Sequence, residues 1–445
     1  MRTSPKSEPA GAPATDVAGV VDHLFRREAG RLVAILARRF GAERLHLAED
    51  VVQDALVQAM RTWPFTGVPV NPTAWILRVA RNRAFDHARR ERLGRGKEPE
   101  FAPLVEDCLA AAVTAPAPQF EDEIRDSQLR MIFVCCHPGL PVAAQVALTL
   151  KVLCGFGERE IATAFLTSEA AIAKRLVRAR KFLREQQVAV ELPRAAELAP
   201  RLEAVLQVLY LLFSEGHRAS RGASLLREDL CADAIRLAEL LILHPVGDRP
   251  ASRALLALMY FNAARLPARL GSDGGLLRLA EQERARWDRA KIRRGVTHLE
   301  ASAGGAELSR FHLEAGIAAC HALAPSEEAT DWARVIELYD ELFAREASPI
   351  VGLNRAVAVA KLRGPAEGLR LLAELPGRAA LDKYALFHAV AGQLWLDAGE
   401  PAKAVPRLRR ALALVALDAE RTHLGRLLAE AGAAEAIAAT GPGGN

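Results

Sequence analysis

The sequence predicts an all-α protein, and three observations support this fold class. Ala, Leu, Arg and Glu, which favour helices, dominate the composition, whereas aromatic residues make up only 5% of the 445 positions. Apolar residues recur at the spacing of amphipathic helices, and no segment shows the alternation of a strand. Hydrophobic residues make up 51% of the chain, which suffices for large cores, and the length predicts about three domains.

The first 94 residues are expected to form a disordered start followed by three helices. Residues 1–17 are polar and rich in Pro and Ala. Helical spacing extends from Val17 to Phe40 and from Leu47 to Thr62, and Pro64 then predicts a loop. A third helix is expected from Thr73 to Arg92. The inward residues predicted for the second helix are Val51, Val52, Leu56 and Met60.

An acidic, proline-rich linker is expected next, at residues 95–122. Residues 98–126 carry eight acidic side chains and one Arg, a net charge of −7, which predicts an extended tether. Helices are expected to resume near Asp122 and to continue to Gln187. Cys135, Cys136 and Cys154 fall within these helices, and we expect them to pack as small apolar residues in the core.

The net charge of the chain is concentrated in its first part. The total is +5, and residues 1–190 contain 27 basic and 22 acidic side chains, whereas residues 191–445 contain 32 of each. Two runs account for the excess: Arg78–Lys97 and Lys174–Arg184 each have a net charge of +6. A charge run is often only a solvated helix face, but runs rich in Arg also match phosphates and guanine edges. Nucleic acid is therefore the expected partner.

The second basic run lies in the pattern of a helix-turn-helix motif. A short helix, Glu158–Phe165, is followed by a tight turn in which Ser168 is a good N-cap. The next helix is expected to bury four apolar residues while its cations point outward, as in a helix that enters a major groove. A purely structural helical hairpin is the alternative. The residues predicted to be buried are Ile172, Leu176, Val177 and Leu183.

The first basic run lies on a helix whose opposite faces differ. Trp75, Ile76, Val79 and Phe85 are expected to face the core, while Arg78, Arg81 and Asn82 face outward. Cations with an amide between them, near the aromatic residues Trp63 and Phe65, suit single-stranded or melted DNA. Trp75 itself is expected in the core.

Two segments resemble the extracytoplasmic-function sigma factors. AEDVVQDALVQAM followed by NPTAWILRVARNRAFDHARR resembles their region 2, expected here at residues 18–94. QLRMIFVCCHPGLPVAAQVALTLKVLCGFGEREIATAFLTSEAAIAKRLVRARKFL resembles their region 4, expected at residues 123–187. The resemblance implies that the protein binds core RNA polymerase and promoter DNA, reading the −35 element with region 4 and reading and melting the −10 element with region 2.

The resemblance also implies roles for individual residues. The residues implied in polymerase binding are Asp50, Gln53 and Asp54. Those implied at the −10 element are Arg78, Arg81, Asn82 and Trp63, with Trp63–Asn71 as a loop that captures a base. Those implied at the −35 element are Ala173, Lys174, Arg175 and Arg178. Ala173 departs from the basic residue that is frequent at its position.

Residues 188–445 extend beyond a minimal member of that family. They resemble the subgroup with tetratricopeptide-like repeats, and we divide them into a helical extension (188–325) and repeats (326–445). Segments 331–364 and 384–414 each look like one repeat, with Gly399 at a turn. The resemblance implies that this tail controls activity and contacts the sigma regions. FSEGH, from Phe213 to His217, replaces a motif of the subgroup, although a structural cap is favoured slightly.

Other functional classes have little support in the sequence. No metal-ligand spacing, phosphate-binding loop or nucleophile motif indicates an enzyme, a metal or a cofactor. Six Cys residues are too few for a disulfide scaffold, and no signal peptide or membrane span is predicted, so a cytoplasmic protein is expected. A stand-alone helix-turn-helix regulator with a sensing repeat domain is the main alternative. A repeat scaffold leaves both basic helices unexplained.

Overall fold

The computed structural model describes residues 29–38, 40–69, 71–95, 117–165, 167–217, 226–272, 274–305, 308–377, 381–415 and 417–440. These residues are almost entirely helical, as the sequence predicts. They contain one isolated bridge, between Leu270 and Leu276, and no strand. The chain divides into two compact units, and the division falls between Val208 and Leu209.

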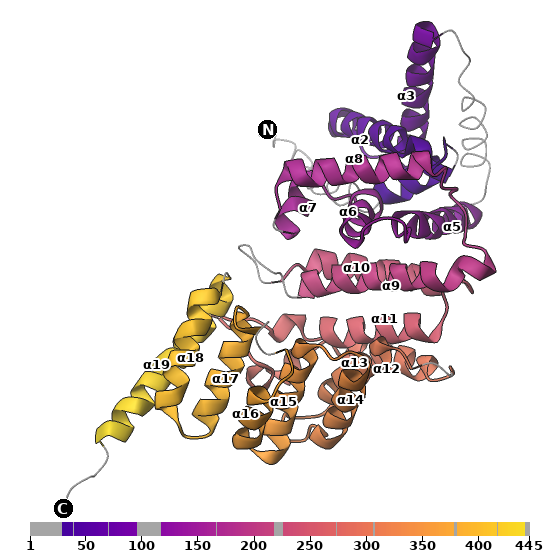
Figure 1. Cartoon of the computed structure of the whole chain (residues 1–445). Helices are drawn as coiled ribbons and strands as arrows, with labels where there is room; N and C mark the ends of the chain where they lie inside the picture. Colours follow the sequence, from indigo (N-terminus) through magenta and orange to yellow (C-terminus); the bar gives the residue numbers. More distant parts are fainter. Residues whose placement is uncertain are drawn as a thin grey trace, which may run out of the picture. The chain divides into compact units, whose positions relative to one another are not determined.

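The first unit contains the segments that resemble regions 2 and 4 (Figure 1). A helix at residues 29–38 opens its described part. The labelled elements that follow are η1 (Ala42–Arg44), α2 (Leu45–Thr66), α3 (Pro72–Arg95), α5 (Ala117–Cys135), α6 (Val142–Leu153), α7 (Glu158–Ala164) and α8 (Glu169–Glu185). The unit ends within α9 (Ala195–His217). Most of the predicted linker at residues 95–122 lies outside the described residues.

Two predicted core positions are wrong, for the same geometric reason. On α2 the buried stripe is Val52, Leu56, Ala59 and Trp63, and Met60 lies one residue beyond it, 52% exposed. On α8 the buried stripe is Ile172, Leu176, Ala179 and Leu183, and Val177 is 61% exposed. One residue turns a helix by about 100°, so an apolar neighbour of a core stripe can face solvent.

The helix boundaries also differ from prediction at two places. Pro64 does not begin a loop, because α2 continues through it to Thr66 and ends at Gly67, whose φ is +78°. Pro64 stands in the last turn of the helix, where a ring without an N–H disturbs few hydrogen bonds. Helix α5 begins at Ala117, before the expected Asp122.

The second unit continues from the end of α9 as a succession of helices (Figure 1). They are α10 (Glu228–Ile242), α11 (Pro250–Ala263), α12 (Arg289–Ser302), α13 (Arg310–Leu323), α14 (Trp332–Arg345), α15 (Pro349–Arg363), α16 (Pro365–Ala373), α17 (Ala385–Asp397), α18 (Pro401–Leu414) and α19 (Asp418–Thr440). Helix α11 is the most enclosed, with every side chain from Ala254 to Phe261 buried. Short 3-10 turns η2 (Leu266–Ala268), η3 (Leu279–Glu281) and η4 (Arg284–Arg286) separate α11 from α12.

Both predicted repeats are helical pairs in the structure. Helices α14 and α15 pack together over one core cluster, and α17 packs on α18. Gly399, with φ +75°, forms the turn between α17 and α18 as expected. Helix α16, which lies between the two pairs, was not assigned from the sequence. Whether the pairs are true tetratricopeptide repeats stays a prediction.

The FSEGH segment forms the last turn of α9 and packs against the start of α10. Gly216 ends α9 so close to α10 that a Cβ atom would lie 2.8 Å from the Arg227 carbonyl oxygen and from the Cys231 nitrogen. The Arg227 N–H donates to the Gly216 carbonyl at 2.8 Å, and the Arg269 guanidinium donates to the His217 carbonyl. These contacts support the structural interpretation of the motif.

Candidate functional site

Helix α8 presents a basic face that is held in place by its apolar face. Ser168 caps the helix as predicted, accepting a hydrogen bond from the Ala171 N–H at 3.2 Å. The four residues of its buried stripe pack into the first unit, which turns Lys174, Arg178 and Lys181 outward, all exposed. Ala173 and Arg175 are partly buried. The residues implied at the −35 element therefore lie along one side of α8, around the exposed Val177.

Helix α3 supplies a second basic surface. Its start is capped by Asn71, whose side-chain oxygen accepts from the Ala74 N–H at 3.0 Å. Arg78 and Asn82 are exposed and one turn apart, while Ile76 and Leu77 are buried on the other side. Trp75 and Val79, expected in the core, are only partly buried, and the side chains of Arg81 and Phe85 lie outside the described residues.

Trp63 does not lie on the DNA-facing surface that the resemblance implies. Its side chain is 2% exposed, and its ring packs edge-on against Trp75 with centroids 5.4 Å apart. The last turn of α2 carries it into the core because it continues the stripe of Val52, Leu56 and Ala59. Phe65, two residues further on, is 89% exposed. Phe65 is thus an exposed aromatic side chain at this end of α2.

The residues implied in polymerase binding form part of a mixed polar and apolar face. Asp50, Gln53 and Asp54 are all exposed on α2. Val57 and Met60 continue the same face at helical spacing and are 41% and 52% exposed. Met is enriched at protein interfaces, whereas Asp is depleted there. Sequence reasoning missed the pair because it placed Met60 in the core.

An ion pair joins α2 to α8. The Arg180 guanidinium lies 2.7 Å from the carboxylate of Glu49, whose side chain is only 7% exposed. Burial raises the pKa of Glu49, and the nearby Arg180 and Lys151 oppose this rise. A small cavity of about 230 Å³, lined by residues including Glu49, Lys151 and Gly30, adjoins the pair. The segments that resemble regions 2 and 4 are thus packed together through a buried charged contact.

The three cysteines expected in the core are buried there. Cys135, Cys136 and Cys154 are each at most 1% exposed, and burial raises the pKa of Cys136 to about 12. The Sγ atom of Cys136 lies 3.7 Å from the Thr149 hydroxyl. Among the described residues, no cluster of His, Cys, Asp or Glu has the makings of a metal site. No described helix is long and apolar enough to cross a membrane.

Comparison with known families matches both segments that resemble sigma regions. Residues 24–93 match Sigma-70 region 2, and residues 130–183 match Sigma-70, region 4. Residues 201–303 match a family of unknown function (DUF6596). An uncharacterized protein of Rhizobium meliloti (strain 1021) is 36% identical over 382 residues, which is 85% of this chain and 89% of the relative.

No solved structure matches the chain. Three observations agree. Region 2 precedes region 4, α3 and α8 each expose a basic face, and a helical part follows both regions. Sigma factor families are not enzymes. The chain belongs to the sigma-70 factors of the extracytoplasmic-function type, carries a C-terminal helical extension, and directs core RNA polymerase to promoters.

Proposed function

We propose that this sigma factor reads the −35 element with α8 and reads and melts the −10 element with α3. The observation that carries the proposal is the exposure of a basic face on each helix. Lys174 and Arg178 on α8, and Arg78 and Asn82 on α3, all face solvent. Arg and Lys in a groove contact bases and phosphates, and an amide between cations suits an unpaired base.

Run-off transcription tests this proposal. Core polymerase is mixed with the full chain and a promoter pool drawn from the source genome, and the products are compared with those of core polymerase alone. Specific products that depend on the added chain are expected. If none appears, the assignment of promoter recognition to this chain is wrong.

The face of α2 binds the polymerase in this proposal. Asp50, Gln53 and Asp54 supply the charges, and Val57 and Met60 supply the apolar area that makes such contacts stable. The inclusion of Val57 and Met60 extends the surface that the sequence implies. Phe65 takes the place of Trp63 as the aromatic side chain near melted DNA.

The arrangement in which α2 and α8 are joined by Glu49 and Arg180 is a closed form in this proposal. A linker of about thirty residues separates the two regions in the sequence, which suits two modules that bind separate DNA elements. A buried ion pair between those modules opposes their separation. Binding to polymerase and promoter would therefore have to break this pair.

The C-terminal helical unit controls activity in this proposal, through contacts with the sigma regions. Support comes from its size, since it makes up more than half of the chain, and from its net charge of zero over residues 191–445. Comparing the full chain with residues 1–208 in the run-off assay tests the idea, because the cut follows the division between the two units. A change in yield in either direction supports control, and equal yields contradict it.

A further inference from the structure

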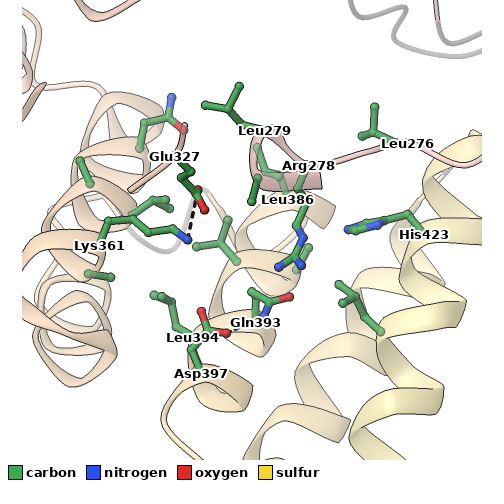
Figure 2. Close-up of a pocket in the computed structure, with 18 of the residues that line it drawn as sticks. Leu276, Arg278, Leu279, Glu327, Lys361, Leu386, Gln393, Leu394, Asp397 and His423 are labelled. Carbon is green, nitrogen blue, oxygen red and sulfur yellow. Dashed lines mark hydrogen bonds and ion pairs between the residues drawn. The ribbon is translucent and has the colours of Figure 1, made fainter. Parts of the chain in front are cut away.

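A cavity of about 510 Å³ lies inside the second unit, among helices α14, α15, α17 and α19. Cavities of about 300–1,000 Å³ are typical of small-molecule sites. Figure 2 shows side chains from several helices converging on this space, Leu386, Leu394 and Lys361 among them. Neither the sigma regions nor the DNA-facing residues contribute to it.

One side of the cavity is closed by the segment between α11 and α12, residues 265–288, which we call the strap. The Leu276 N–H donates to the Ala419 carbonyl at 3.2 Å, which fastens the strap to the start of α19. Further along, the Arg284 guanidinium donates to the His321 and Ala324 carbonyls at 2.6 and 2.8 Å. An extended peptide would have to displace these contacts. The strap therefore makes the space suitable for a small molecule.

Most of the lining is apolar. The apolar lining includes Val357 from α15, Leu386 and Leu394 from α17, Leu424 from α19, and Trp332. Such a wall favours an aliphatic chain, because binding removes the apolar surface of the wall and that of the chain from water. Polar side chains stand between these apolar groups, and several of them are charged.

Arg265 is a cation in the wall of the cavity. It lines the cavity, its Nε lies 3.4 Å from the amide oxygen of Gln282, and its guanidinium lies 5.8 Å from the ring of Trp287. Among the described residues, no carboxylate pairs with it. Burial, with Arg284 nearby, lowers the pKa of Arg265 to about 10, so it stays charged at neutral pH. A buried charge of this kind is stabilised by an anion.

The other charged groups around the cavity have partners in the protein. Lys361 lies 3.2 Å from Glu327, and the pair is drawn in Figure 2. The carboxylate of Asp397 accepts from the amide of Gln393 at 2.7 Å. The amide oxygen of Gln393 is itself buried and has no hydrogen-bond partner among the described residues. Figure 2 shows Arg278 reaching from the strap toward Gln393, and its guanidinium lies 3.2 Å from the carboxylate of Glu281.

We propose that this cavity binds a small amphipathic carboxylate, with its chain against Leu386, Leu394 and Val357 and its carboxylate paired with Arg265. The protein would then hold a regulatory or stabilising ligand within the extension of the sigma factor. The inference goes beyond promoter recognition and does not depend on it. It differs from peptide binding, which a concave helical surface would otherwise suggest.

Calorimetric titration of the full chain tests the proposal with three probes that share one chain: octanoate, octanol and octylamine. Octanoate is expected to bind at least about tenfold more tightly than the neutral and cationic probes, a difference of about 1.4 kcal/mol. Arg265→Gln should remove that preference. Ala389→Phe, which fills the cavity, should abolish octanoate binding. Arg363→Gln, an exposed Arg outside the cavity, is the matched control and should bind as the unchanged chain does.

Equal binding of the three probes, no binding of octanoate, or octanoate binding that survives Ala389→Phe would overturn the proposal. If Arg265→Gln fails to fold, as judged by circular dichroism, the probe preference of the unchanged chain and the Ala389→Phe result still decide it. A loss of promoter recognition in the run-off assay would leave this outcome unaffected, because the binding assay contains no DNA and no polymerase.

Discussion

At the scale of single residues, the functional surfaces follow from which side of a helix each charge occupies. Arg178 and Lys174 are one turn apart and exposed because the buried stripe of α8 lies opposite them. Their cations are therefore available without any rearrangement of the helix. The same reasoning places Arg78 and Asn82 together on α3.

Arg178→Ala is expected to weaken binding to promoter DNA that contains the −35 element by about 1–3 kcal/mol, because one guanidinium contact is lost. Polymerase binding should be unchanged. Gel-shift titration of the holoenzyme on promoters with and without that element measures the effect. Arg363→Ala, an exposed Arg in the other unit, is the control. Equal affinity of the Arg178 variant and the unchanged chain for both promoters would contradict the assignment.

Alanine substitutions at Trp63 and at Phe65 are expected to affect different properties of the protein. Trp63→Ala removes a buried ring that packs on Trp75 and should lower the free energy of unfolding by about 3–5 kcal/mol. Phe65→Ala removes an exposed ring and should leave that free energy nearly unchanged while reducing strand opening. Urea unfolding and permanganate footprinting of promoter complexes provide the two measurements. Normal opening by the Phe65 variant would remove Phe65 from the DNA surface.

At the scale of elements, the contact between α2 and α8 depends on one buried ion pair. Arg180→Ala leaves Glu49 buried without its partner, and we expect the association of the two regions to weaken by about 3 kcal/mol. Limited proteolysis of the linker reports the opening. The double variant Glu49→Gln with Arg180→Gln should be closer to the unchanged chain than Arg180→Ala is. If Arg180→Ala is no more sensitive to protease, the pair does not hold the closed form.

The same contact predicts a pH dependence. Burial raises the pKa of Glu49 in the closed form above its usual value, so the closed form binds the proton more tightly than the open form. Ionisation of Glu49 therefore disfavours the closed form, so opening increases as the pH rises from the usual carboxylate pKa through the raised pKa and levels off above it. Linker proteolysis between pH 5 and pH 8 measures this, with Glu49→Gln as the variant that should lose the trend. A trend that persists in that variant belongs to other groups.

The close contact between α9 and α10 requires a glycine at position 216. Gly216→Ala would place a Cβ atom 2.8 Å from backbone atoms of Arg227 and Cys231, and we expect a loss of about 1–3 kcal/mol in unfolding free energy. Gly425→Ala in α19 is the control, because nothing lies within 4 Å of its added Cβ atom. Helix propensity should make that control neutral or slightly stabilising. Urea unfolding distinguishes the two.

At the scale of the whole molecule, the chain divides into two compact units. We expect two transitions in calorimetric unfolding, because multi-domain proteins commonly unfold without full cooperativity. Octanoate should raise only the transition of the second unit, and a chain of residues 1–208 should show only the other. A single transition that includes both units would contradict the division.

The charge distribution also belongs to this scale. The excess of +5 arises in the first 190 residues, which contain both basic helices.

The fold class, the helix-turn-helix motif, the Ser168 cap and the paired helices of the tail were all predictable, because each depends on local spacing. The burial of Trp63 and the exposure of Met60 and Val177 were not, since the pattern of a single helix leaves the borders of its buried face ambiguous.

The all-α class, the two basic helices and the resemblance to sigma factors can all be predicted from the order of the residues. Periodicity, capping residues and charge runs are properties of neighbouring residues, so they are visible without coordinates. The contact of Glu49 with Arg180, the packing of Trp63 on Trp75, and the cavity that Arg265 lines become visible only in the folded chain. These contacts join residues far apart in the chain, and their formation depends on how helices pack rather than on the pattern within any one of them.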